Sequence, residues 1–121
     1  MAINTLITVV DDDPWMCRML TRIISAAGFD VAAFTSAEEF LDSGRLADSA
    51  CLILDIDLPG MSGIKLQQWL NNSNHHIPII FISGKGDAQT RECVLQAGAA
   101  HFFNKPFSMD SLLTTIHAVG L

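Results

Sequence analysis

The feature that most constrains the fold is an uncharged run, Cys51 to Leu54, which ends in Asp55 and precedes the turn-forming pair Pro59-Gly60. Branched apolar residues bounded by turn formers are typical of a strand that is buried on both faces, as in a parallel sheet. In open α/β sheets, ligands bind in the crevice outside the carboxyl ends of the strands. The sequence therefore predicts that Asp55 takes part in chemistry, and we treat it as the centre of the candidate site.

The same pattern recurs along the chain, where predicted strands alternate with predicted helices. β-rich runs occur at 6–10, 29–34, 51–55, 77–82 and 101–104, and helical periodicity occurs at about 14–28, 36–41, 64–70, 87–98 and from 108 onward. Such alternation implies right-handed crossovers and a parallel sheet with helices on both faces. A chain of 121 residues is long enough for one core and too short for two. We expect an α/β, doubly wound, five-stranded parallel sheet in a single domain that spans residues 1–121.

Capping signals support four of the predicted helix starts, and those of the fourth and fifth helices are Asp87 and Ser108. Asp13 precedes Pro14, and proline suits the first helical position because its missing N–H costs nothing there. With Asp13 as the N-cap, the carboxylates of Asp11 and Asp12 remain free for another purpose. Ser36 and Glu39 have the spacing of a capping box, which predicts the start of the second helix.

Composition and charge exclude several classes of function. The net charge of -6, from 13 acidic and 7 basic residues, argues against direct binding to nucleic acid. No apolar run approaches the roughly 20 residues that span a bilayer, and the N-terminus lacks the regions of a signal peptide, so we expect a cytoplasmic protein without membrane contact. Cys17, Cys51 and Cys93 are odd in number and share no CxxC-type spacing. We expect three buried free thiols rather than a disulfide framework or a zinc site.

Chemically active side chains follow four of the predicted strands, at the carboxyl end of each. These residues are Asp11, Asp12, Asp55, Asp57, Ser83 and Lys105. Carboxylates crowded within a few ångströms repel each other, and Lys105 and a divalent cation would relieve this repulsion. Mg²⁺ prefers hard oxygen ligands and is usually held by one or two carboxylates plus a phosphate. The set indicates phosphoryl transfer to Asp55 as the nucleophile, with the metal and Lys105 neutralising charge on the phosphoryl oxygens.

The sequence resembles a known family over essentially its whole length. The matching segments are Val9 to Pro14, Asp55 with Pro59 to Gly63, Ser83-Gly84, and Lys105 to Phe107, in the order and at the spacing of that family. The family is the receiver domain of two-component response regulators, which has the fold of the chemotaxis regulators. The resemblance implies a sheet with strand order 2-1-3-4-5. The segment Ser83 to Asp87 is also similar to receivers of the FixJ subgroup.

The resemblance implies roles for the acidic residues. Asp55 is similar to the phosphoacceptor, Asp12 to the direct metal ligand and Asp11 to its water-mediated partner. Asp57 matches the position that coordinates the metal through its backbone carbonyl. The implied ion is Mg²⁺, with Mn²⁺ as the alternative, and Asp55 would be a ligand as well as the phosphoacceptor.

The resemblance also implies roles for residues of the last two strands. Ser83 is similar to the hydroxyl that closes on the phosphoryl group, with Gly84 beside it, and Lys105 is similar to the lysine that pairs with that group. Phe102 matches the aromatic switch position. Without a phenol hydroxyl, Phe102 would switch by packing alone, and the alternative is that it is a plain core residue.

The resemblance implies signalling rather than the turnover of an ordinary enzyme. A histidine kinase or a histidine phosphotransfer protein would donate the phosphoryl group, and the domain would catalyse only its own phosphorylation and dephosphorylation. The added charge would let Ser83 and Lys105 pull on their loops. The surface of the fourth helix, fifth strand and fifth helix would then change for an effector domain, a partner protein or a second copy in a homodimer.

Two charged positions beside the site vary within the family and are candidates for tuning the reaction rate. We expect Asp57 and Lys85 to attract each other, to slow access of the hydrolytic water and so to change the phosphoryl lifetime. The alternative is two solvated loop charges. Trp15 is either a lid over the site or a half-exposed surface residue, and Trp69 is expected in the core or at an interface.

Two other classes of protein share part of this pattern. A small haloacid-dehalogenase-type phosphatase, dependent on Mg²⁺, is favoured by the Asp55-Ile56-Asp57 motif after an apolar strand, with a hydroxyl and a lysine downstream. The short chain, the lack of a cap domain and the position of the motif on the third strand argue against it. A flavodoxin-like cofactor binder would need a Ser/Thr/Gly-rich loop after the first strand, where this chain has acids.

Overall fold

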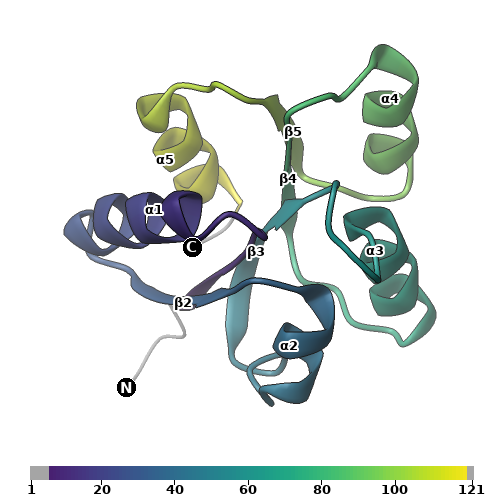
Figure 1. Cartoon of the computed structure of the whole chain (residues 1–121), viewed down its shortest axis with the longest axis horizontal. Coiled ribbons are helices and arrows are strands. Elements are labelled where there is room, and N and C mark those ends of the chain that lie inside the picture. Colours follow the sequence, from purple (N-terminus) through teal and green to yellow (C-terminus); the bar gives the residue numbers. More distant parts are fainter. Residues whose placement is uncertain (1–5, 120–121) are drawn as a thin grey trace.

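One parallel sheet forms the centre of the molecule, with helices on both of its faces (Figure 1). The computed structural model describes residues 6–119, and none of the helices in this range is long and apolar enough to cross a bilayer. The elements, in chain order, are β1 (Leu6–Val10), α1 (Pro14–Ala26), β2 (Asp30–Phe34), α2 (Ala37–Asp42), β3 (Ser49–Asp55), α3 (Gly63–Asn72), β4 (Ile79–Ser83), α4 (Ala88–Gln96), β5 (His101–Asn104) and α5 (Met109–Ala118). All strand pairs are parallel and the order is β2-β1-β3-β4-β5. The predicted fold class and strand order are confirmed.

The two faces of the sheet are covered by different helices, α1 and α5 on one side and α2, α3 and α4 on the other (Figure 1). Alternate residues of β3 belong to the two layers. Leu52 and Leu54 pack in the cluster beside α2, α3 and α4, whereas Cys51 and Ile53 pack in the cluster beside α1 and α5. Because this strand is buried on both faces, it is apolar at every one of these positions.

Four helices begin where their capping signals predicted. Asp13 Oδ1 accepts a hydrogen bond from the backbone N–H of Trp15 at 2.9 Å at the start of α1. Ser36 Oγ accepts from the N–H of Glu39 at 3.0 Å at the start of α2, while the Glu39 carboxylate accepts from the N–H of Thr35 at 3.0 Å. These bonds satisfy donors that a helix leaves unpaired, and they hold the first turns of α1 and α2 next to the carboxyl ends of the strands.

Three strands begin at residues other than those predicted, and one of them, β3, begins two residues earlier, at Ser49. β4 begins at Ile79 rather than at Ile77, because Pro78 has no N–H to donate to a neighbouring strand. The carbonyl of Pro78 still accepts a hydrogen bond from the N–H of Leu52 at 2.9 Å, so the chain already runs alongside β3 there. β2 begins one residue later than predicted, at Asp30.

The burial of the cysteines follows the depth of the elements that carry them. Cys17 in α1 and Cys51 in β3 are buried and free, as predicted. Burial raises the pKa of the Cys51 thiol to about 12, which keeps it protonated and unreactive at neutral pH. Cys93 is exposed, so the prediction of a buried thiol is wrong there. The reason is that α4 buries only Val94 and turns its other residues towards solvent.

Both tryptophans reach the surface. Trp15, in the first turn of α1, is 57% exposed, which agrees with a surface residue. Trp69, in α3, is 40% exposed and stacks on the ring of His75 at a centroid distance of 5.9 Å. Of the two alternatives for Trp69, the core is therefore wrong, because α3 turns Leu66 and Leu70 inwards instead, while a place at an interface stays a prediction.

Candidate functional site

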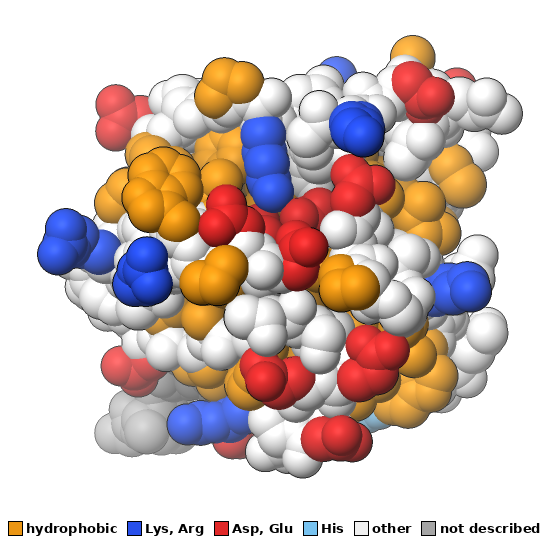
Figure 2. All heavy atoms as spheres, viewed as in Figure 1, with side chains coloured by type: hydrophobic (Ala, Val, Ile, Leu, Met, Phe, Trp, Pro, Cys, Tyr) orange, Lys and Arg blue, Asp and Glu red, His pale blue; other side chains and the backbone are white. Residues whose placement is uncertain are grey.

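Carboxylates gather at the carboxyl edge of the sheet. Asp11, Asp12 and Asp55 each offer a carboxylate oxygen, and these atoms all lie within 4.8 Å of one another. Figure 2 shows acidic side chains together near the centre of one face of the molecule, with a basic side chain beside them. Asp11 follows β1 and Asp55 ends β3, and these two strands pair side by side. The adjacency of β1 and β3 therefore brings the acids together.

Asp11 is a fully buried carboxylate with two donors. Its Oδ1 accepts a hydrogen bond from the backbone N–H of Asp13 at 2.9 Å, and its Oδ2 accepts from Lys105 Nζ at 3.0 Å. Burial raises the pKa of Asp11 above its ordinary value, although the hydrogen bonds from Asp13 and Lys105 act in the opposite direction. Removing this carboxylate from water is therefore unfavourable, and its partners only partly compensate.

Asp55 is the last residue of β3 and is 3% exposed. Its Oδ1 accepts from the backbone N–H of Asp57 at 2.9 Å, and its Oδ2 accepts from Lys105 Nζ at 3.1 Å. Both oxygens are thus held in set directions by donors on different elements. Such positioning suits a carboxylate that attacks a bound group along a fixed line.

One ammonium group pairs with two buried carboxylates. Lys105 follows β5, and its backbone N–H donates to the carbonyl of Ser83 at 2.8 Å, which anchors it at the edge of the sheet. Burial acts to lower the pKa of Lys105, but the hydrogen bonds and charges of Asp11 and Asp55 raise it above its ordinary value. Lys105 is therefore protonated at neutral pH, and its single positive charge stands against three nearby carboxylates.

Ser83 ends β4 and is buried beside Asp57. Its Oγ donates to Asp57 Oδ2 at 3.3 Å and accepts from the backbone N–H of Lys85 at 3.2 Å. No ion pair joins Asp57 to Lys85 in the part of the chain that the structure describes. The Asp57 carboxylate is instead hydrogen bonded to the Ser83 hydroxyl, and the tuning role of Asp57 and Lys85 stays a prediction.

The Phe102 ring points into the core. Phe102 is 4% exposed and belongs to the cluster beside α2, α3 and α4. A side chain at Gly86 would collide with this ring, so a glycine is needed there for the ring to keep this position. Gly84, by contrast, has open space around its Cα, and a side chain would fit there. The switch role of Phe102 and the phosphoryl-binding role of Gly84 stay predictions.

Glu38 also contacts this edge of the molecule, and it was not predicted from the sequence. It lies in the first turn of α2, and its Oε2 accepts from the backbone N–H of Met61 at 3.0 Å in the loop that leads from Asp55 to α3. The bond joins residues 23 positions apart, and the only local signal at Glu38 is the common preference for acids in the first turn of a helix. Nothing in the sequence pattern identifies it as a contact of the loop.

The donor atoms fit a hard divalent cation. All three clustered side chains offer carboxylate oxygens, two of them buried and one exposed. The exposed one, Asp12, makes no hydrogen bond or ion pair within residues 6–119, so its oxygens are free to bind an ion. Mg²⁺ prefers oxygen ligands and keeps several of its waters, which an exposed ligand on one side permits.

Comparison with known sequences decides the family. The sequence model of the response regulator receiver domain matches residues 7–117. The chain belongs to the response regulator receiver family. This receiver is 42% identical over 115 residues to "Nodulation protein W" of Bradyrhizobium diazoefficiens, covering 95% of this chain and 51% of that protein. It is 34% identical over 110 residues to "Transcriptional regulatory protein FixJ" of Azorhizobium caulinodans, covering 91% of this chain and 52% of that protein.

Solved structures of receivers have the same fold. The response regulator StyR superposes with a TM-score of 0.86 at 40% identity, covering 93% of this chain and 57% of that one. The crystal structure of FixJ-N superposes with a TM-score of 0.85 at 30% identity, covering 98% of this chain and 94% of that one. The chain spans about half the length of the curated relatives it matches.

Membership of this family confirms the predicted function at the level of the domain. Receivers are the phosphoacceptor modules of two-component signalling, and they are signalling domains rather than ordinary enzymes. The haloacid-dehalogenase-type alternative is not favoured, because the receiver model covers the Asp55-Ile56-Asp57 motif and nearly all of the remaining chain.

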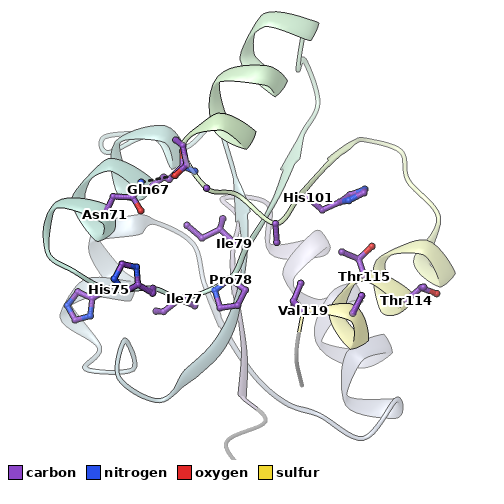
Figure 3. Close-up of a pocket in the computed structure, with 15 residues that line it drawn as sticks. Gln67, Asn71, His75, Ile77, Pro78, Ile79, His101, Thr114, Thr115 and Val119 are labelled. Carbon is purple, nitrogen blue, oxygen red and sulfur yellow. Dashed lines mark hydrogen bonds between the residues drawn. The ribbon is translucent and has the colours of Figure 1, made fainter.

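A separate cavity lies at the opposite edge of the sheet. It has a volume of about 910 Å³ and is lined at the amino ends of β4 and β5 by Ile79 and His101, between α3 and α5 (Figure 3). At its border, the Asn71 side-chain amide donates to the carbonyl of Ala97 at 2.9 Å. The residues described around this cavity include no Asp, Glu, Lys or Arg, so it lacks the carboxylates and the ammonium group that gather at Asp55.

The double pairing of Lys105 predicts a measurable loss of stability in Lys105→Met. Methionine fills a similar space without a charge, so the buried carboxylates of Asp11 and Asp55 lose their cation. We expect a loss of about 1–3 kcal/mol in the free energy of unfolding by urea, at pH 7 and without divalent cations.

The matched control is Lys65→Met, because Lys65 is exposed in the first turn of α3. We expect this control to change the free energy of unfolding by less than about 0.5 kcal/mol. A double variant, Lys105→Met with Asp55→Asn, should recover part of the loss by removing one of the unpaired charges. Equal effects of Lys105→Met and Lys65→Met would contradict the double pairing.

Proposed function

We propose that Asp55 accepts a phosphoryl group from a histidine kinase or a histidine phosphotransfer protein in the cytoplasm, and that the resulting change at the sheet edge controls an effector. The observation that supports this most is the placement of Asp55. Its carboxylate ends a central strand, its Oδ2 is 3.1 Å from Lys105 Nζ, and it lies within 4.8 Å of the ligand atoms of Asp11 and Asp12. These are the groups that positioning and charge neutralisation in phosphoryl transfer require.

In this proposal Mg²⁺, or Mn²⁺, is held by Asp11, Asp12, Asp55 and the backbone carbonyl of Asp57. When bound, the ion supplies positive charge next to the oxygens of the transferred group. An oxygen of Asp55 attacks the phosphorus, the bond from phosphorus to the donor nitrogen breaks, and the donor imidazole keeps the electron pair. Lys105 leaves its contact with the Asp55 oxygen and pairs with a phosphoryl oxygen.

The output in this proposal begins at Ser83 and Lys105. Phosphorylation adds nearly two negative charges and new acceptor oxygens, which favours transfer of the Ser83 hydroxyl from Asp57 to the phosphoryl group. Gly84 follows Ser83 and would move with it. Gly86 belongs to the same loop as Ser83 and Gly84, and the Phe102 ring lies beneath Gly86. Movement of this loop therefore alters the packing of the ring. The surface of α4, β5 and α5 then changes for an effector domain, a partner protein or a homodimer mate.

The proposal predicts that acetyl phosphate modifies the protein once, at Asp55, when Mg²⁺ is present. The Asp55 oxygen forms a bond to phosphorus, and acetate leaves. Intact-mass spectrometry should show the gain of one phosphoryl group for the wild type and none for Asp55→Asn. Removal of Mg²⁺ with a chelator should also abolish the gain.

A matched pair of neighbouring variants tests the metal ligands. Asp12→Asn should slow phosphorylation at least about tenfold, because it removes a proposed metal ligand. The substitution breaks no hydrogen bond or ion pair of Asp12 among residues 6–119, so the fold should be unaffected. Asp13→Asn removes the same charge from the adjacent position and keeps the N-cap of α1, so its rate should stay near that of the wild type.

Phosphorylation of Asp55→Asn, or steady hydrolysis of a phosphomonoester by the wild type, would contradict the proposal.

We also retain Asp57 and Lys85 as candidates for tuning the phosphoryl lifetime. The basis is that Asp57 contacts the Ser83 hydroxyl and the backbone of Lys85 contacts the same hydroxyl, which is the group proposed to bind the phosphoryl oxygens. Dephosphorylation, followed by mass after the donor is removed, should be faster in a double variant, Asp57→Asn with Lys85→Ala. Equal decay rates in the double variant and the wild type would dismiss this tuning.

A further inference from the structure

The loop between β3 and α3, residues 56–62, directly follows the proposed phosphoacceptor Asp55. Its first part is tied closely to the sheet. The N–H of Asp57 donates to Asp55 Oδ1 at 2.9 Å, and the N–H of Gly63, just after the loop, donates to the carbonyl of Ile56 at 3.0 Å. A side chain at Gly63 would collide with the backbone carbonyl of Asp55. The loop therefore closes back tightly against the residue that it follows.

The tip of this loop, residues 59–61, has one hydrogen bond to another element among the residues that the structure describes. That bond runs from the backbone N–H of Met61 to Glu38 Oε2, at 3.0 Å. The same carboxylate lies close under Gly60, where an added Cβ would be 2.5 Å from Glu38 Oε2. Gly60 has a positive φ of 71°, so a side chain there would be strained as well as crowded.

The Glu38 carboxylate is well suited to this contact at neutral pH. The hydrogen bond from Met61 lowers the pKa of Glu38 below its ordinary value, so the carboxylate is fully charged there. α2 does not need Glu38 as a cap, because Ser36 and Glu39 already satisfy the start of that helix. Glu38 differs from Glu39 in that its carboxylate accepts a hydrogen bond from the β3–α3 loop.

We propose that Glu38 is a positioning residue for phosphorylation, which fixes the tip of the β3–α3 loop and thereby the backbone carbonyl of Asp57 that would hold the metal. This inference rests on the proposed function. Glu38 touches neither the phosphoryl group nor the ion. It acts through Met61 and through the short chain segment that joins Met61 to Asp57, so its loss raises the cost of ordering that segment when the ion binds.

The test compares Glu38→Ala, Glu38→Gln and Glu39→Ala. Mg²⁺ affinity is measured by titration calorimetry, and the initial rate of phosphorylation by acetyl phosphate is measured as a function of Mg²⁺ concentration. Glu38→Ala should weaken Mg²⁺ binding about fivefold, which is the value of one ordinary hydrogen bond. Its rate at saturating Mg²⁺ should stay within about twofold of the wild type, since the reacting groups are intact.

The other two variants separate positioning from charge and from helix stability. Glu38→Gln keeps an acceptor oxygen for Met61 and should restore Mg²⁺ affinity to within about twofold of the wild type. Glu39→Ala removes the same charge from the same turn and weakens the cap of α2, so it should lower the melting temperature without changing Mg²⁺ affinity.

Two results would overturn the proposal. One is a Mg²⁺ affinity of Glu38→Ala equal to that of the wild type, and the other is an equal loss of affinity in Glu38→Ala and Glu39→Ala. Failure of the proposed function has a different signature, because the wild type itself would then gain no phosphoryl group while its Asp55→Asn variant behaved in the same way.

Discussion

The structure depends on one interaction, the ammonium group of Lys105 placed between the carboxylates of Asp11 and Asp55. Nζ is 3.0 Å from Asp11 Oδ2 and 3.1 Å from Asp55 Oδ2. At such distances the attraction amounts to several kcal/mol per pair near a protein surface, which offsets part of the cost of burying two acids. Without this cation, the carboxylates at the ends of β1 and β3 would be buried side by side with no positive charge to pair with, which would destabilise the fold. The same cation gives the site its chemistry, because it can move from Asp55 to the oxygens of an incoming phosphoryl group.

The order of the strands determines which residues can contribute to the site. β1 and β3 are neighbours, so short aspartate side chains at their ends meet directly. β5 is separated from β3 by β4, a distance of two strand spacings or about 9–10 Å, so only a long side chain such as that of Lys105 reaches across. The short side chain of Ser83, which lies on the intervening β4, reaches the carboxylate of Asp57. The long side chain of Lys105 therefore matches the distance of β5 from Asp55.

Much of the fold and the site could be predicted because each depends on local patterns. The apolar run before Asp55 and the cap at Asp13 are short-range signals, and parallel topology then places the strand ends together. The rest depends on contacts that no local pattern encodes. The hydrogen bond from Met61 to Glu38 joins a loop to the first turn of α2 after folding, and the choice of Ser83 rather than Lys85 as the partner of Asp57 depends on side-chain directions. The exposure of Cys93 depends on how shallowly α4 packs, which its sequence leaves open.

The most direct test is a crystal structure of the protein with Mg²⁺ and beryllofluoride, a tetrahedral mimic of the phosphoryl group. The account predicts beryllofluoride on a carboxylate oxygen of Asp55, with Lys105 Nζ and Ser83 Oγ in contact with its fluorines. It also predicts that Mg²⁺ is coordinated by Asp12 and the carbonyl of Asp57. Beryllofluoride on any other side chain, or a Lys105 still paired with both Asp11 and Asp55 in the complex, would contradict it.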